Sequence, residues 1–96
     1  MTDSDAIQLE LQIQAKQLRF RMVETAIALG LTLNNLAQVE ASMGNDGQAS
    51  WASENARRVH REVQDCLSTT DFNAEERKWA IKNLSQLELA ISAKDS

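Results

Sequence analysis

The chain has 96 residues and a formal net charge of −4, with 14 acidic and 10 basic side chains. This acidic balance argues against a general nucleic-acid binder, because most nonspecific affinity for nucleic acid comes from Lys and Arg that neutralise phosphates. The single cysteine, Cys66, excludes an intrachain disulfide and any metal site built from paired cysteines.

The composition favours a few long helices. The chain has no proline and only three glycines, so helix breakers are scarce. Apart from the pair Thr69 and Thr70, the β-branched residues occur singly, and we therefore expect no strand. No run approaches the roughly 20 apolar residues of a membrane span. The sequence begins with acids where a secretory signal has bases, so we expect a cytoplasmic protein.

The longest predicted element is one helix over residues 4–43, with apolar residues on two nearly opposite faces. The larger face, which we call the main stripe, continues in phase through residues 30–35. This continuity favours a single helix despite Gly30, which costs about 1 kcal/mol in a helix interior. The main stripe, which we expect to face the intrachain core, consists of Ile7, Leu11, Ala15, Leu18, Met22, Ala26, Leu29, Leu33, Leu36 and Met43.

The opposite face of this helix predicts a protein interface. A short C-terminal hairpin should cover only one side of the helix, and monomers rarely leave a large apolar patch uncovered. We therefore expect a homodimer, with an obligate hetero-complex as the alternative. The predicted interface residues are Leu9, Ile13, Phe20, Val23, Ile27 and Leu31.

Two breaks divide the rest of the chain. Residues 44–50 contain two glycines and an Asn-Asp pair, which predicts a loop with Ser50 as the N-cap of a helix over residues 51–67. Residues 68–73 predict a turn. Asn73 and Glu76 have the spacing of a capping box, so we expect a third helix over residues 74–93.

These elements predict an all-α fold in one domain: a long N-terminal helix packed against a C-terminal helical hairpin, as a three-helix bundle that we expect to be dimeric. The larger residues of the predicted core are Leu18, Met22, Leu29, Val59, Val63, Leu84 and Leu87.

Candidate chemistry is sparse. His60 and Cys66 could form a base and a nucleophile, but six residues apart on a helix their side chains diverge by roughly 120°. Cys66 is better explained as a small residue at the edge of the core. The Glu-x-x-His pattern of helical metal sites is missing because Arg57 stands three residues before His60. We therefore expect no catalytic residue, no cofactor and no metal.

The function predicted from these features is a non-enzymatic helical interaction module, such as a small adaptor, a chaperone-like protein or a regulatory subunit. The alternative is a DNA-binding regulator with a divergent helix-turn-helix, in which residues 31–38 resemble a first helix. The only basic cluster surrounds Arg57, Arg58 and Arg61, and acids on the same helix balance its charge. Binding to nucleic acid is therefore the less favoured reading.

Overall fold

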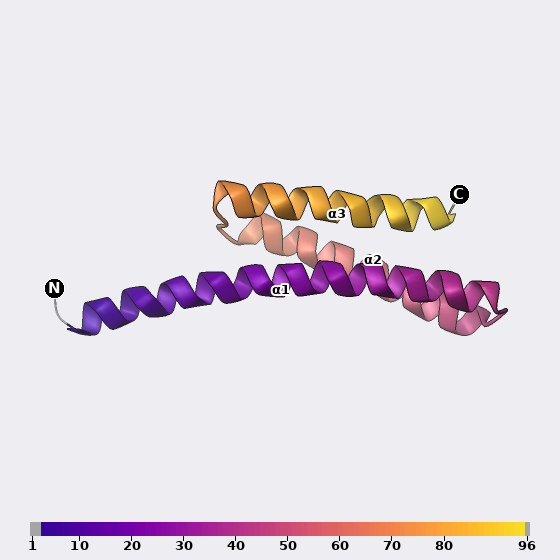
Figure 1. Cartoon of the computed structure of the whole chain (residues 1–96), viewed down its shortest axis with the longest axis horizontal. Coiled ribbons are helices and arrows are strands. Elements are labelled where there is room, and N and C mark those ends of the chain that lie inside the picture. The colour runs from indigo at the N-terminus through magenta and orange to yellow at the C-terminus, as the bar shows by residue number, and fades with distance from the viewer. Residues whose placement is uncertain (1–2, 96) are drawn as a thin grey trace.

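The computed structural model describes residues 3–95, which form three helices and no strand. They are α1 (Asp3–Ser42), α2 (Asp46–Thr69) and α3 (Ala74–Asp95). In Figure 1, α2 runs antiparallel to α1, and α3 runs in the same direction as α1. The molecule is elongated, with principal extents of 63 × 21 × 16 Å. The predicted all-α fold, a long first helix with a helical hairpin, is confirmed.

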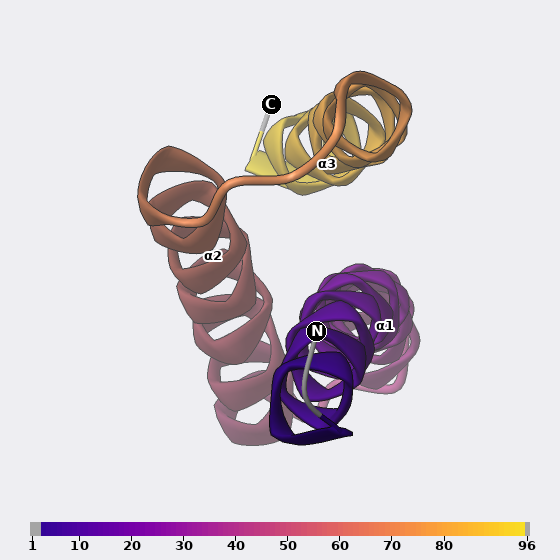
Figure 2. The ribbon, with the colours of Figure 1, turned by 90° about the vertical axis from the view of Figure 1, so that its left-hand side faces the viewer.

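Gly30 lies where all three helices meet, and α1 continues through it without a break, as predicted. A Cβ atom placed on Gly30 would lie 2.7 Å from Cδ2 of Leu87 on α3 and 3.3 Å from Cγ1 of Val59 on α2. The glycine therefore allows both helices of the hairpin to approach the backbone of α1 closely. Seen along the molecule in Figure 2, the three helices lie around a common axis, and buried side chains from all three form one core cluster.

The connection between α1 and α2 is much shorter than the predicted loop over residues 44–50. Gly44 has a φ of 81° and its amide donates to the carbonyl of Ala41, while the amide of Asn45 donates to the carbonyl of Glu40. These two bonds form a Schellman motif, which satisfies the last carbonyls of α1 within two residues. Because the chain is free to start a helix at once, α2 begins at Asp46, and the predicted N-cap at Ser50 is wrong.

The connection between α2 and α3 contains the predicted capping box. The amide of Glu76 donates to Oδ1 of Asn73 at 2.8 Å, and the amide of Asn73 donates to Oε1 of Glu76 at 3.2 Å. Nη2 of Arg77 also donates to the carbonyl of Thr70 at 3.1 Å, across the turn. The turn is thus fixed by side chains of its own and of the first turn of α3. Helix α2 extends to Thr69, two residues beyond its predicted end.

The hairpin covers the face of α1 that was predicted to remain exposed. Val23 and Ile27 are 3% and 2% exposed and lie in the core. Leu18 and Met22 of the predicted core are instead 59% and 63% exposed, and Leu29 is also exposed. The predicted core positions on the hairpin are confirmed, because the structure buries Val59, Val63, Leu84 and Leu87.

The reason for this exchange of faces is the size of the side chains. The buried face of α1 includes Gly30 and Ala37, whose small volumes let two helices pack closely against it. The main stripe consists mostly of Leu and Met, which would hold a neighbouring helix at a greater distance. The hairpin therefore covers the face that allows close packing, and not the main stripe with its larger apolar area.

Three aromatic rings join the middle of α1 to the start of α3. The ring centroid of Phe20 lies 6.2 Å from that of Phe72 and 5.5 Å from that of Trp79, both in edge-to-face arrangements. Such pairs add about 0.5–1.5 kcal/mol each beyond the burial of their area. Phe20, which was predicted at an interface between chains, is thus partly buried within its own chain.

One buried polar group is unusual. The side chain of Asn34 is 2% exposed, and its Oδ1 has no hydrogen-bond partner among the residues that the structure describes. A buried oxygen without a partner costs about 1–3 kcal/mol of desolvation. Burying this oxygen of Asn34 therefore lowers the stability of the fold.

Candidate functional site

The most prominent surface feature is a row of exposed apolar side chains along α1. Its residues are separated by steps of three, four or seven, which is the spacing of the a and d positions of a coiled coil. We call this row the α1 seam. Its members, all more than a third exposed, are Leu11, Leu18, Met22, Leu29, Leu36, Val39 and Met43.

The α1 seam differs from the scattered apolar residues of an ordinary surface because it is continuous. Its first and last residues are 32 positions apart, which corresponds to about 48 Å of helix at 1.5 Å per residue. Its exposed apolar surface is on the order of 700 Å², more than the largest patch of many monomers. Only threonines, Thr25 and Thr32, occupy the heptad positions between its central members.

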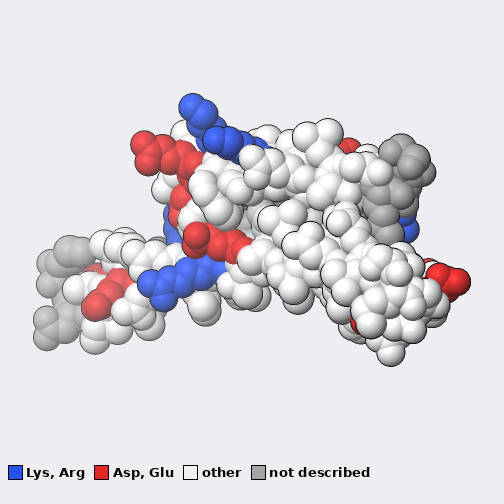
Figure 3. Space-filling view, turned by 45° about the vertical axis from the view of Figure 1, so that its right-hand side comes forward, with Lys and Arg blue, Asp and Glu red and all other residues white. Residues whose placement is uncertain are grey.

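Charged residues flank the seam unevenly. Arg19 and Arg21 lie beside its N-terminal half, and Glu40 lies beside its C-terminal half. Small residues, Ala26 and Ala28, flank the centre, where they leave room for the backbone of another helix. On the side of the molecule drawn in Figure 3, most of the charged side chains lie left of the centre and a few lie at the right-hand end, with a broad area without Lys, Arg, Asp or Glu between them.

The first part of α1 extends beyond the hairpin. Every side chain of residues 4–14 is exposed, and Figure 1 shows this segment projecting past the turn between α2 and α3. We call it the N-terminal arm. Its large apolar residues, Ile7, Leu9, Leu11 and Ile13, are each about half exposed.

The residues predicted to form a protein interface are therefore divided by the structure. Leu9 and Ile13 are exposed on the N-terminal arm, while Phe20 and Leu31 pack partly buried against the core. The expectation that the hairpin leaves Val23 and Ile27 uncovered is wrong. An interface role for Leu9 and Ile13 stays a prediction.

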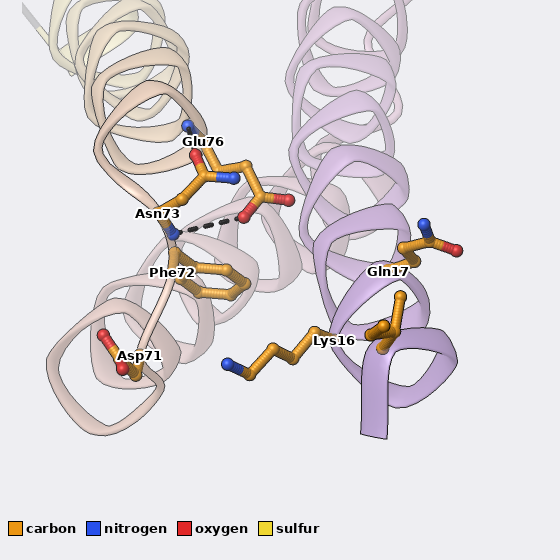
Figure 4. A pocket seen from close by; sticks show the side chains of 7 residues that line it. Lys16, Gln17, Asp71, Phe72, Asn73 and Glu76 are labelled. Carbon is orange, nitrogen blue, oxygen red and sulfur yellow. Dashed lines mark hydrogen bonds between the residues drawn. The ribbon is translucent and has the colours of Figure 1, made fainter. Parts of the chain in front are cut away.

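A polar groove lies where the N-terminal arm meets the turn between α2 and α3. It has a volume of about 480 Å³ and is lined by Ile13, Lys16, Gln17, Asp71, Phe72, Asn73 and Glu76. Figure 4 shows the side chain of Lys16 extending from α1 across the groove toward this turn. The carboxylate of Glu76 is already engaged by the amide of Asn73 in the capping box. Of the polar groups around the groove, Asn73 and Glu76 thus serve to hold the turn.

His60 and Cys66 are not brought together. Cys66 packs against the core, with its Sγ 3.6 Å from Oγ1 of Thr70, which confirms its predicted place at the core edge. His60 instead lines the outer groove between α2 and α3, near Glu88. Among residues 3–95, no three His, Cys, Asp or Glu side chains are grouped as a metal site.

The structure also places the two features that suggested DNA binding, residues 31–38 and the arginine cluster of α2. Residues 31–38 lie inside the uninterrupted α1, and Leu33, Asn34 and Ala37 of this stretch are buried against the hairpin. Arg57, Arg58 and Arg61 line a shallow depression that also contains Glu54. The structure therefore forms neither the tight turn of a helix-turn-helix at this point nor a purely basic surface around the arginines.

Comparison with known proteins adds no relative: no family model, no curated protein and no solved structure matches the chain. None of the helices within the described part of the chain has the length and apolarity needed to cross a membrane.

The sequence shows both apolar faces of α1, and the main stripe, which was predicted to face the core, contains every seam residue except Val39. The signal that distinguishes the faces is Gly30, together with Val23, Ile27, Asn34 and Ala37 at steps of three and four around it. A glycine inside a long helix lowers stability unless another backbone or side chain must come close. That requirement marks the face on which the hairpin packs, and it leaves the seam as the outer surface.

Proposed function

We propose that this protein is a non-enzymatic helical interaction module that works through helix-helix contacts and associates with itself. The observation that carries the proposal is the α1 seam, an exposed apolar face with coiled-coil spacing along almost the whole of α1. Its area of roughly 700 Å² is close to the ~800 Å² per partner that a standard stable interface buries.

The form of the seam supports a helix as the bound element. Side chains at heptad positions on one helix pack into the spaces between those of a facing helix, whereas a globular surface seldom offers a complementary row of this length. A second copy presents the same row, so it is complementary in length and in spacing. A homodimer therefore satisfies the seam with no further component.

The remaining parts of the proposal concern chemistry and place. A non-enzymatic role is supported by the separation of His60 from Cys66, which does not pair the two side chains as base and nucleophile. A cytoplasmic location is supported by the free thiol of Cys66, which suits a reducing compartment.

Sedimentation equilibrium tests the self-association. We expect the wild-type protein to be dimeric at micromolar concentration. Leu18→Glu combined with Leu29→Glu should weaken the dimer at least about 100-fold, because each change puts a charge into a buried apolar contact in both copies. The matched control is Leu89→Glu on α3, where the side chain is 70% exposed and lies off the seam.

Two results would contradict the proposal. One is a wild-type protein that stays monomeric at high micromolar concentration. The other is a dimer that the seam variant weakens no more than Leu89→Glu does.

A salt titration with duplex DNA tests the alternative function, since log affinity falls steeply with log salt for a true DNA binder. We expect no measurable binding to DNA.

A further inference from the structure

The spacing of the α1 seam residues and the charges beside them indicate how a second copy is oriented. We propose that two copies pair through their seams in antiparallel alignment, centred near residue 27, so that each N-terminal arm lies against the C-terminal end of the other copy's α1. This inference rests on the proposed self-association and adds its geometry.

The register follows from the positions of the seam residues. In an antiparallel pair of heptad helices, a positions face d positions of the other helix. Alignment about residue 27 places Leu18 opposite Leu36 of the second copy, and Leu11 opposite Met43 of the second copy. It pairs every seam member with a residue at a heptad position of the facing helix. A shift by one heptad in one direction leaves Leu11 facing the start of α2. A shift in the other direction places the apolar Val39 and Met43 opposite the polar Gln8 and Ser4 of the second copy.

Part of the N-terminal arm is accounted for by this register, because residues 11–14 face residues 40–43 of the second copy. Residues 4–14 are all exposed and project past the turn between α2 and α3, and only Ile13 among them lines the groove beside that turn. In the antiparallel pair, each arm reaches the level at which the second copy's α1 ends, at Met43 and the Gly44 turn. The arm's apolar residue Leu11 is then covered by the second copy, so the projecting segment becomes part of the interface.

The charges beside the seam favour antiparallel over parallel pairing. Arg19 and Arg21 flank its N-terminal half, and Glu40 flanks its C-terminal half. Antiparallel alignment sets the basic half of one seam against the acidic half of the other. Parallel alignment brings all four arginines of the two copies to the same level, where like charges repel. The helix dipoles of an antiparallel pair are opposed, and their attraction also favours this alignment.

Disulfide trapping tests the arrangement in the full-length protein. All variants include Cys66→Ser, so that the native thiol does not react. Leu18→Cys in one chain and Leu36→Cys in a second, longer-tagged chain place the two thiols opposite each other only in the antiparallel register. Both residues are exposed within the chain, so the substitutions should not disturb folding. Leu89→Cys, on α3 away from the seam, is the control.

We expect the mixed Leu18→Cys and Leu36→Cys sample to give the covalent heterodimer as its main oxidised product. Leu18→Cys alone and Leu89→Cys alone should remain uncrosslinked. Efficient crosslinking of Leu18→Cys to itself would overturn the antiparallel alignment while leaving the self-association intact. A sample that sediments as a dimer yet gives no mixed crosslink would overturn the register. A monomeric wild type would remove both this inference and the proposed dimer.

Discussion

Gly30→Ala is the sharpest test of the packing between the three helices. In an unconstrained helix interior this change stabilises by about 1 kcal/mol. Here the new Cβ would lie 2.7 Å from Cδ2 of Leu87 and 3.3 Å from Cγ1 of Val59. Favourable contacts between carbon atoms lie at about 3.5–4.0 Å, so the Leu87 side chain must move by roughly 1 Å.

The surroundings of Leu87 determine the sign of the effect. Leu87 is completely buried, so its movement disturbs other core side chains, and such overpacking costs about 1–3 kcal/mol. This cost exceeds the propensity gain, and we expect Gly30→Ala to lower the free energy of unfolding by about 1 kcal/mol. Leu87→Ala alone should cost about 2–5 kcal/mol. In the Gly30→Ala background it should cost about 1–2 kcal/mol less, because the added methyl group fills part of the cavity.

Urea unfolding followed by far-ultraviolet circular dichroism measures these differences, with all variants at one protein concentration because dimerisation contributes to stability. Gly47→Ala is the matched control, since a Cβ on Gly47 meets nothing within 4 Å. It should be neutral or stabilising. If Gly30→Ala stabilises as much as Gly47→Ala, or if the two core substitutions are additive, the close approach at Gly30 is refuted.

Two further predictions concern single side chains. Asn34→Ala should change the free energy of unfolding by less than about 1 kcal/mol despite complete burial, because it removes an oxygen that has no partner and improves helix propensity; a loss above about 2 kcal/mol in urea would show that this oxygen is hydrogen-bonded. Asn73→Ala should cost about 1 kcal/mol through loss of the capping box, whereas Asn73→Ser should restore most of that stability, and equal losses for the two variants in thermal unfolding would contradict a capping role.

Local signals in the sequence predicted the helices well. The Asn73–Glu76 box depends only on residues three apart, and the structure forms it as expected. The chain reversal after α1 was also visible, since Gly44 supplies the left-handed conformer that ends a helix. The start of α2 was misplaced because Asn45 and Asp46 read as loop residues. The Schellman motif needs only Gly44 and Asn45, so the helix could begin directly after them.

The assignment of faces could not be read from hydrophobicity, because α1 is apolar on two sides. Periodicity gives the direction of each stripe but not the distance at which a neighbour packs. That distance is set by small side chains, and Gly30 is the residue at which Leu87 and Val59 meet the backbone. The candidate site was missed for the same reason, since the more regular stripe was taken for the core and became the exposed seam.

Binding of a partner to the projecting N-terminal arm is coupled to the folding of the arm itself. Because all of its side chains are exposed, the arm is helical mainly by propagation from the packed part of α1, and each added residue is close to balance between helix and coil. Ordering a residue costs about 1–2 kcal/mol of conformational entropy, which only local helix formation offsets here. A surface that covers the arm therefore also selects its helical state. Recognition there is coupled to a helix–coil equilibrium, which makes it specific for partners that fit a helix and readily reversible.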